Sequence, residues 1–434
     1  VRNSAGKFET STEHVSHLFD GCAQLHAFSF KKGKVSYANK FLKTNYYEKA
    51  LQTGSFSKGF TADPCPLVFK RVLSYFRSRG TTMEFDNANV NVSKIADKFV
   101  ALTETPLPIE FNLNTLETVG HMSFDDTLKG HVTTAHPHTD VDSGELFNYL
   151  THFGRESSYL VYAMPLKGNK RRLLATVPVE KPSYMHSFGI TKNFIILTEI
   201  PFRVNPLHLL FMNKPFIKNF VWNPEEGTIF TVINRNNGEI TGRFKAEPFF
   251  TFHHVNAFEQ DGLLMVDLIA YKDASHLDEL SFENLFKQGD KRLTKRPLTR
   301  FVVDIKKGLV TSRVLSNRNI EMPRINYQAY NMKPYTYVYA IEFTHNDDKL
   351  VKINVETGAV VEWKEKGCSP GEPVFIAAPR ASTEDDGVIV SVILDAYAKS
   401  SFLLVLDART FKERARARVP HHIPFQIHGE FFGD

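Results

Sequence analysis

Four histidines stand in apolar, strand-like stretches where an imidazole could bind a metal ion. They are His136 (TTAHPHTD), His186 (PSYMHSFGI), His253 (FFTFHHVNAF) and His428 (FQIHGEFF), separated by 50, 67 and 175 residues. Neutral imidazole is a common ligand of iron, copper and zinc. No local motif contains these histidines, so they can share a metal only if the fold brings distant segments to one point. A hydrogen-bonded core histidine is the competing interpretation at each position.

Two of these sites offer a choice between neighbouring histidines. Side chains alternate along a strand, so only one of His253 and His254 can point toward a shared axis. His136 and His138 are two residues apart and would share one face of a strand. Strand geometry therefore leaves the choice between His136 and His138 open.

Three glutamates in similar apolar stretches could support such a metal site. They are Glu104 (ALTETPLP), Glu321 (NIEMPRINY) and Glu372 (SPGEPVFI). A metal-bound imidazole usually donates its second N–H to a carboxylate, which fixes the tautomer and the orientation of the ring. Three carboxylates would also offset the charge of a divalent ion held by four neutral ligands. A turn or an ion pair is the alternative role for each glutamate.

A repeated hairpin pattern indicates the elements that would position these side chains. The pattern is an alternating apolar strand, a small or acidic turn residue, two polar residues, Gly or Thr, and a second strand. Its clearest copies begin at Asn112, Asp304, Asn354 and Asp407, and looser copies begin at Ser29, Pro165 and Asn234. Asn, Asp and Gly favour tight turns, and the flanking Val, Ile, Phe and Tyr favour strands.

The seven copies predict the architecture. Their spacings of 83, 53, 69, 70, 50 and 53 residues suit one four-stranded blade per copy. We therefore expect an all-β fold, a seven-bladed β-propeller that forms a single domain over residues 1–434 and closes by combining N- and C-terminal strands. The sequence starts at Val1 rather than Met, so we expect an N-terminal strand to be missing from it. Inner strands of different blades converge on one axis, where the four imidazoles could meet.

Composition narrows the functional classes. The chain has 434 residues, of which 42% are hydrophobic, enough for a large core. Its net charge of +5 is mild and comes with no long basic run, so we expect no nucleic-acid partner. Three widely spaced cysteines and the absence of a recognisable signal peptide favour a reducing compartment, the cytoplasm. No apolar run reaches the ~20 residues of a membrane-spanning helix.

Other features suit a lipophilic ligand. The chain has 37 Phe against 2 Trp, and these rings could line an apolar cavity, although ordinary β-core packing explains any one of them more simply. Residues 67–79 (LVFKRVLSYFRSR) combine helically spaced apolar residues with basic ones, which is typical of a helix at a membrane interface. Packing of this helix on the propeller is the alternative.

Short stretches along nearly the whole chain resemble the carotenoid cleavage oxygenase family, which includes the vertebrate retinoid isomerase and the stilbene-cleaving dioxygenases. The matching stretches, in the family's order, are HLFDG (17–21), TADPC (61–65), LTET (102–105), TAHPH (134–138), SYMHSFG (183–189), FHHVNAFE (252–259), EMPRINY (321–327), KPYTYVY (333–339), GEPVF (371–375), EDDGV (384–388) and IHGEF (427–431).

This resemblance implies a propeller capped by a dome of loops and short helices, with one non-haem Fe(II) per chain on the axis. The implied ligands are His136, His186, His253 and His428, so the resemblance selects the first histidine of each neighbouring pair. The implied carboxylates behind the ligands are Glu104, Glu321 and Glu372. The implied residues near the substrate are Phe8, Phe56, Thr103 and Tyr184. Iron also fits oxygenation, because zinc has no redox chemistry.

The resemblance implies a dioxygenase that uses O₂ to cleave one double bond of a lipophilic polyene, a carotenoid or an apocarotenoid, into carbonyl products. Retinoid isomerohydrolysis is one alternative, but Arg324 matches the cleaving members rather than the isomerase. Cleavage of stilbenes is another, but Thr103 stands where those enzymes have Lys. A propeller adaptor without catalytic activity is the remaining alternative.

The resemblance also implies peripheral association with a membrane. Residues 67–79 match the family's docking patch, and Cys65 matches a cysteine of the animal-type DPC motif. That motif continues with Lys, whereas this chain has Pro66. We therefore expect a membrane surface to be contacted through residues 67–79 rather than through acylation of Cys65.

Overall fold

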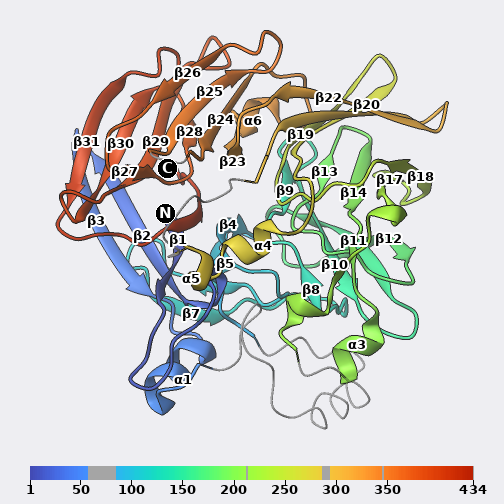
Figure 1. Cartoon of the computed structure of the whole chain (residues 1–434), viewed down its shortest axis with the longest axis horizontal. Helices are drawn as coiled ribbons and strands as arrows, with labels where there is room; N and C mark the ends of the chain where they lie inside the picture. The colour runs from blue at the N-terminus through green and yellow to red at the C-terminus, as the bar shows by residue number, and fades with distance from the viewer. Residues whose placement is uncertain (57–84, 212–213, 286–293, 345–346, 434) are drawn as a thin grey trace.

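Seven antiparallel sheets form a ring around a central axis, the predicted seven-bladed β-propeller (Figure 1). The computed structural model describes residues 1–56, 85–211, 214–285, 294–344 and 347–433. Cys65 and residues 67–79 lie outside these ranges. Within them, no helix has both the length and the apolar character that crossing a membrane requires.

The first four blades follow the chain from its start. The first blade contains β1 (Arg2–Lys7), β2 (Cys22–Lys31), β3 (Lys34–Phe41) and the last strand of the chain, β32 (Gln426–Gly429). The second contains β4 (Asn91–Ile95), β5 (Lys98–Leu102), β6 (Ile109–Phe111) and β7 (Thr118–His121). The third contains β8 (Val132–Thr133), β9 (His138–Asp140), β10 (Glu145–His152), β11 (Ser158–Pro165) and β12 (Arg172–Pro178). The fourth contains β13 (Gly189–Ile190), β14 (Phe194–Glu199), β17 (Thr228–Asn234) and β18 (Ile240–Ala246).

Three further blades complete the ring. The fifth contains β19 (His254–Gln260), β20 (Leu263–Ile269), β21 (Leu298–Asp304) and β22 (Leu309–Ser316). The sixth contains β23 (Ile320–Arg324), β24 (Tyr337–Glu342), β25 (Lys349–Asn354) and β26 (Val360–Trp363). The seventh contains β27 (Cys368–Pro370), β28 (Val374–Ala377), β29 (Gly387–Asp395), β30 (Ser400–Asp407) and β31 (Glu413–Val419).

The connections between strands carry the short helices. They contain η1 (Leu18–Asp20), α1 (Asn45–Thr53), α3 (Pro206–Phe211), η2 (Phe216–Asn219), η3 (Pro224–Glu226), α4 (His276–Glu279), α5 (Phe282–Leu285) and α6 (Tyr327–Tyr330), together with the ribbon of β15 (Phe202–Arg203) and β16 (Val221–Trp222). The helices α4 and α5 lie near the centre of the ring in Figure 1. They belong to the connection between β20 and β21, so the fifth blade supplies part of the cover over the axis.

All seven predicted hairpin turns connect the two outer strands of a blade, including the three with looser patterns. The turn between β25 and β26 illustrates the local chemistry. The Asn354 side chain accepts hydrogen bonds from the amides of Glu356 and Thr357, each at 2.9 Å. Gly358 then adopts a φ of 73°, which residues with a Cβ rarely adopt. These turns depend on a few adjacent residues, so they could be predicted without knowledge of the tertiary structure.

The ring closes where the two ends of the chain meet. Strand β32 pairs antiparallel with β1, and Arg2 lies opposite Gly429 in this pairing. The expected combination of N- and C-terminal strands in one blade is therefore confirmed. Because β32 contains His428, the same pairing brings one candidate ligand to the axis.

The core lies between neighbouring blades. Phe147, Tyr149 and Phe188 are fully buried in the cluster that joins the third and fourth blades. Phe249 and Phe301 stack with ring centroids 4.5 Å apart where the fourth blade meets the fifth. Many phenylalanines thus fill the β-core, as the simpler of the two explanations proposed.

A buried ion pair also joins the third and fourth blades. Arg235 Nη2 lies 2.6 Å from Asp140 Oδ2, and Arg235 Nη1 donates to the carbonyl of Thr191 at 2.7 Å. The guanidinium also lies 4.3 Å from the centroid of the Phe147 ring. A buried charge that loses its partner is strongly destabilising, because the remaining charge has neither water nor a counter-ion.

We predict that Asp140→Ala lowers the free energy of unfolding by about 3–5 kcal/mol, because it leaves the Arg235 guanidinium buried without a carboxylate. Urea unfolding followed by circular dichroism measures this change. Arg172→Ala is the control, since it breaks an exposed pair with Glu145 and should cost less than about 1 kcal/mol. Similar losses in both variants would contradict a special role for the buried pair.

Candidate metal centre

The four predicted histidines meet at one point although four different blades supply them. One ligand nitrogen from each of His136, His186, His253 and His428 lies within 4.8 Å of the corresponding nitrogen of the other three. His136 lies between β8 and β9, His186 just before β13, His253 just before β19, and His428 in β32. The inner edges of the third, fourth, fifth and first blades therefore supply the four rings, three from residues next to a strand and one from a strand.

The spacing of the nitrogens suits a shared metal ion. Nε2 of His136 lies 3.0 Å from Nε2 of His186, and Nε2 of His253 lies 3.2 Å from Nε2 of His428. Two nitrogens bonded at right angles to one metal at about 2.1 Å would lie about 3.0 Å apart. An all-imidazole donor set suits iron, copper or zinc.

The alternatives to His136 and His253 have other partners. Nitrogens of His138 lie 2.8 Å from the Tyr327 hydroxyl and 2.8 Å from the Phe188 carbonyl oxygen. Nitrogens of His254 lie 2.7 Å from Ser187 Oγ and 2.8 Å from Thr198 Oγ1.

The structure follows strand alternation in one of these pairs and departs from it in the other. His253 and His254 point in different directions, as alternation predicted. The expectation that His136 and His138 share a face was wrong, because β8 ends at Thr133 and β9 begins at His138, so His136 lies outside any strand.

The three predicted glutamates each contact a different histidine of the cluster. The distance to a glutamate oxygen is 2.5 Å from His186 Nδ1 to Glu104, 2.5 Å from His253 Nδ1 to Glu321, and 2.8 Å from His428 Nδ1 to Glu372. An ionised carboxylate only accepts hydrogen bonds, so these Nδ1 atoms carry the hydrogen. Each Nε2 is left with its lone pair directed toward the centre of the cluster.

Further residues hold the glutamates in place. The Tyr184 hydroxyl donates to Glu104 at 2.8 Å, and the Tyr271 hydroxyl donates to Glu321 at 2.5 Å. Arg2 Nη1 lies 3.1 Å from Glu372 Oε2. Two carboxylates are thus anchored by neutral phenols and the third by a cation.

A local backbone distortion aims Glu321 at the axis. The pairing of β23 with β24 shifts register between Glu321 and Arg324, and Met322 has a left-handed φ of 54°. The amide of Met322 donates to Glu321 Oε2 at 2.6 Å. Strained backbone of this kind persists where surrounding contacts hold it, and it is frequent at functional sites.

Burial and hydrogen bonding set the charge states of the cluster. Burial lowers the pKa of His428 to about 4, although Glu372 opposes the shift. Burial, with the charges of the other three histidines, holds the pKa of His136 well below its usual value. Burial alone would raise the pKa of Glu321, but His253 and the hydrogen bonds from Tyr271 and the Met322 amide lower it to about 2. The imidazoles of His136 and His428 are therefore neutral at pH 7 and the carboxylate of Glu321 is ionised, the states that favour binding of a metal cation.

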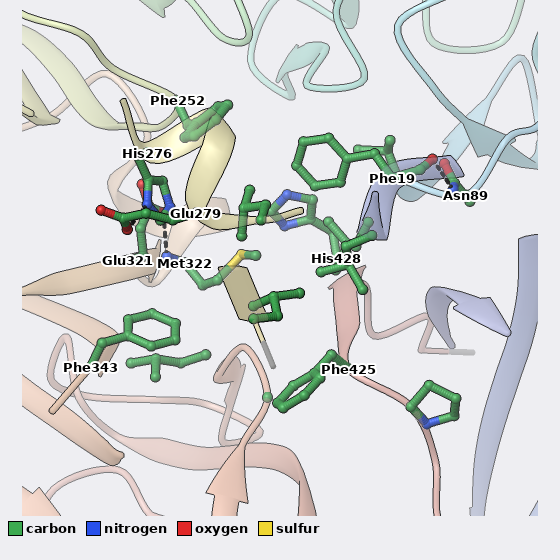
Figure 2. Close-up of a pocket in the computed structure, with 18 of the residues that line it drawn as sticks. Phe19, Asn89, Phe252, His276, Glu279, Glu321, Met322, Phe343, Phe425 and His428 are labelled. Atoms are coloured by element: carbon green, nitrogen blue, oxygen red, sulfur yellow. Dashed lines mark hydrogen bonds and ion pairs between the residues drawn. The ribbon is translucent and has the colours of Figure 1, made fainter. Parts of the chain in front are cut away.

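A cavity of about 1200 Å³ reaches the cluster and is lined by His186, His253 and His428. Its aromatic lining includes Phe8, Phe19, Phe85, Phe252, Phe282, Phe343 and Phe425. Figure 2 shows Phe19 and Asn89 on one side of the cavity and His276, Glu279 and Glu321 on the other. A long apolar molecule could therefore lie alongside the imidazoles.

The predicted substrate-binding residues are only partly brought together. Phe8, Thr103 and Tyr184 line the cavity, and the Tyr184 hydroxyl is held by Glu104. Phe56 is not among the described residues of the lining. Its ring instead stacks on Tyr46, with centroids 5.9 Å apart.

Sequence reasoning missed Arg2, Tyr271 and a group of polar residues in the cavity wall. Arg2 stands near the start of the chain and Glu372 is 370 residues further on. Tyr271 and Glu321 are 50 residues apart. No local spacing links such pairs, so only the ring closure and the meeting of blades could identify them.

The chain is similar to known proteins in sequence and in fold. A family model described as retinal pigment epithelial membrane protein matches residues 1–433. The chain is 32% identical to the beta,beta-carotene 15,15'-dioxygenase of Mus musculus, with 100% of this chain and 86% of the relative covered. It is 31% identical to the carotenoid isomerooxygenase of Galleria mellonella, with 99% and 90% covered. The structure of a mutant apocarotenoid oxygenase from Synechocystis is similar at a TM-score of 0.85 and 25% identity, with 98% of this chain and 90% of that chain covered.

We predict that Glu321→Gln weakens metal binding by about 10- to 100-fold, because a neutral amide supports the Nδ1–H of His253 less well than a carboxylate. Titration of the metal-free protein with Co²⁺, followed by visible absorption, measures the affinity. Glu117→Gln, at an exposed glutamate, is the control and should bind Co²⁺ like the wild type. Equal affinities in the Glu321 and Glu117 variants would remove Glu321 from the centre.

Proposed function

Because the chain belongs to the retinal pigment epithelial membrane protein family, the carotenoid cleavage oxygenases, we propose that it is a dioxygenase that cleaves one double bond of a carotenoid or an apocarotenoid. The reaction consumes O₂ and yields two carbonyl products. One observation carries the proposal: four imidazoles with inward lone pairs meet at one point, and three of them line a cavity that also contains many aromatic side chains. A metal ion and an apolar polyene could bind next to each other at this site, whereas a non-catalytic propeller adaptor would need neither the histidine cluster nor the cavity.

His136, His186, His253 and His428 are the proposed ligands of a single Fe(II). The donor set supports this assignment, since it contains four neutral nitrogens and no thiolate. Fe(II), when bound, would supply the redox chemistry that activates O₂, which zinc cannot supply. Glu104, Glu321 and Glu372 would hold three of the rings in the tautomer that presents Nε2 to the ion.

The protein's own task is to position the substrate. Neighbouring double bonds of a conjugated polyene are chemically similar, so the cleaved bond is selected by where the chain comes to rest along the cavity. Phe8, Thr103 and Tyr184 are proposed to contact the polyene, together with Phe252, whose ring centroid lies 5.2 Å from that of His186. Phe56 remains a proposed contact from sequence alone.

A polyene substrate dissolves in membranes rather than in water, which supports the proposal that the enzyme works at a membrane surface from the cytoplasm. Residues 67–79 are proposed to make that contact. The argument for them comes from their basic and apolar pattern.

We predict that His186→Ala loses bound iron and that its activity falls by more than about 100-fold. Removing a metal ligand should have a larger effect than removing a carboxylate that only orients a ligand. Iron is measured by elemental analysis of the purified protein, and activity by loss of polyene absorption. His138→Ala is the matched control, since His138 bonds to Tyr327 and Phe188 instead. Full iron content in the His186 variant would exclude this residue as a ligand.

The reaction itself is tested by incubating the iron-loaded enzyme under isotopically labelled O₂ with a carotene, an apocarotenoid, a retinyl ester and a hydroxylated stilbene. Products are reduced at once to alcohols, so that the label does not exchange with water, and are weighed by mass spectrometry. We expect labelled fragments from the carotene or the apocarotenoid. Unlabelled retinol isomers from the ester would indicate isomerohydrolysis, and labelled fragments from the stilbene alone would indicate stilbene cleavage.

A further inference from the structure

A compact polar group stands among the aromatic residues of the cavity wall. It consists of His276 and Glu279 on α4 and Arg296 just before β21, and all three line the cavity. His276 and Arg296 are buried, with 7% and 4% of their surfaces exposed. Figure 2 shows His276 and Glu279 on the same side of the cavity as Glu321. We call these three residues the polar end of the cavity.

The contacts within the polar end fix its hydrogen-bonding capacity. His276 Nδ1 lies 2.6 Å from Glu279 Oε2, and Arg296 Nη2 lies 3.8 Å from the same oxygen. The other oxygen of Glu279 accepts a hydrogen bond from Thr294. Glu279 is therefore occupied on both oxygens, and its hold on Nδ1 leaves Nε2 as the nitrogen of His276 that can meet a ligand. No described residue bonds to that nitrogen.

Ring contacts and hydrogen bonds link the polar end to the histidine cluster. The rings of His276 and Tyr271 stack with centroids 5.0 Å apart, and the Tyr271 hydroxyl donates to Glu321, which holds His253. The ring of Phe252 lies edge-on to His276, with centroids 5.9 Å apart. A group bound to His276 is thus separated from the four imidazoles by one layer of aromatic rings.

The polar end restricts which chemical group a substrate can place beside His276 and Arg296. A hydrocarbon end would exclude water from His276 and Arg296 without giving them new partners, and unpaired buried polar groups are costly. A hydroxyl can donate to His276 Nε2 and accept from the Arg296 guanidinium. A carboxylate is less suitable, because Glu279 already places a negative charge beside both residues. An aldehyde has no hydrogen to donate.

We propose that the polar end binds a hydroxyl group at one end of the polyene, so that the enzyme prefers a hydroxylated carotenoid or apocarotenoid to a hydrocarbon one. This inference rests on the proposed cleavage function and adds a substrate class to it. The bound hydroxyl would also set how far the polyene extends past the imidazoles, and thereby contribute to the choice of double bond.

The experiment compares kcat/KM for β-carotene and for the same carotene hydroxylated on one ring. We expect the wild type to prefer the hydroxylated compound by about 10- to 100-fold, since a site built for a hydroxyl rejects the analogue that lacks it. His276→Phe keeps a flat ring beside Tyr271 but removes both nitrogens. It should bring the ratio close to one, because the hydroxylated substrate loses its partner and β-carotene no longer buries an unpaired imidazole.

Two further variants separate this role from a general effect on folding. Glu279→Gln keeps the shape of the group but no longer fixes the hydrogen on Nδ1, and it should reduce the preference by about 10-fold. His14→Phe, at an exposed histidine away from the cavity lining, is the control and should keep the wild-type ratio. Iron content and thermal melting confirm that each variant is folded and loaded.

Equal kcat/KM values for the two substrates in the wild type would overturn the inference while leaving cleavage itself intact. So would an unchanged ratio in His276→Phe, or stronger binding of a polyene that ends in a carboxylate. If the wild type cleaves neither compound, cleavage of these carotenes is excluded, and the inference is then decided by binding. Quenching of tryptophan fluorescence without O₂ measures the affinities, and the hydroxylated carotene must bind about 10-fold more tightly for the inference to stand.

Discussion

The hydrogen bond between an inward-facing imidazole and a buried carboxylate is the interaction on which this centre depends. A bare cluster of four neutral imidazoles could rotate and present either nitrogen. Pairing of Nδ1 with a glutamate removes that freedom in His186, His253 and His428. A carboxylate buried for this purpose needs further partners, because its charge has left water. The phenols of Tyr184 and Tyr271 and the guanidinium of Arg2 meet that need, so the rigidity of the centre extends well beyond its ligands.

The three glutamates differ in whether a cation neutralises their charge. Glu372 lies against Arg2, with Arg324 3.8 Å away, so its negative charge is matched within the protein. Glu104 and Glu321 are hydrogen-bonded by tyrosines, which carry no charge at neutral pH. Among the described groups around the histidines, two carboxylate charges are therefore left without a nearby cation. Two negative charges would complement one divalent ion held by neutral ligands in a buried position.

Sequence predicted the parts of the molecule that depend on short stretches of chain. The hairpin turns, such as that at Asn354, are made by adjacent residues, so their number gave the number of blades. The meeting of the four histidines followed from the convergence of inner strands. Strand alternation could not decide between His136 and His138, and the strand is in fact interrupted there. Only the family resemblance selected His136. The polar end of the cavity was not predicted, since α4 shows no distinctive sequence pattern and its partner Arg296 lies 17 residues beyond Glu279.

The histidine cluster depends on the pairing of β32, the last strand of the chain, with β1, the first strand. Three of the four histidines precede the end of the fifth blade in the chain, but the fourth belongs to the strand that closes the ring. A nascent chain that stops short of β32 would lack both the seal and His428. The complete set of four imidazoles therefore exists only when the ring is closed.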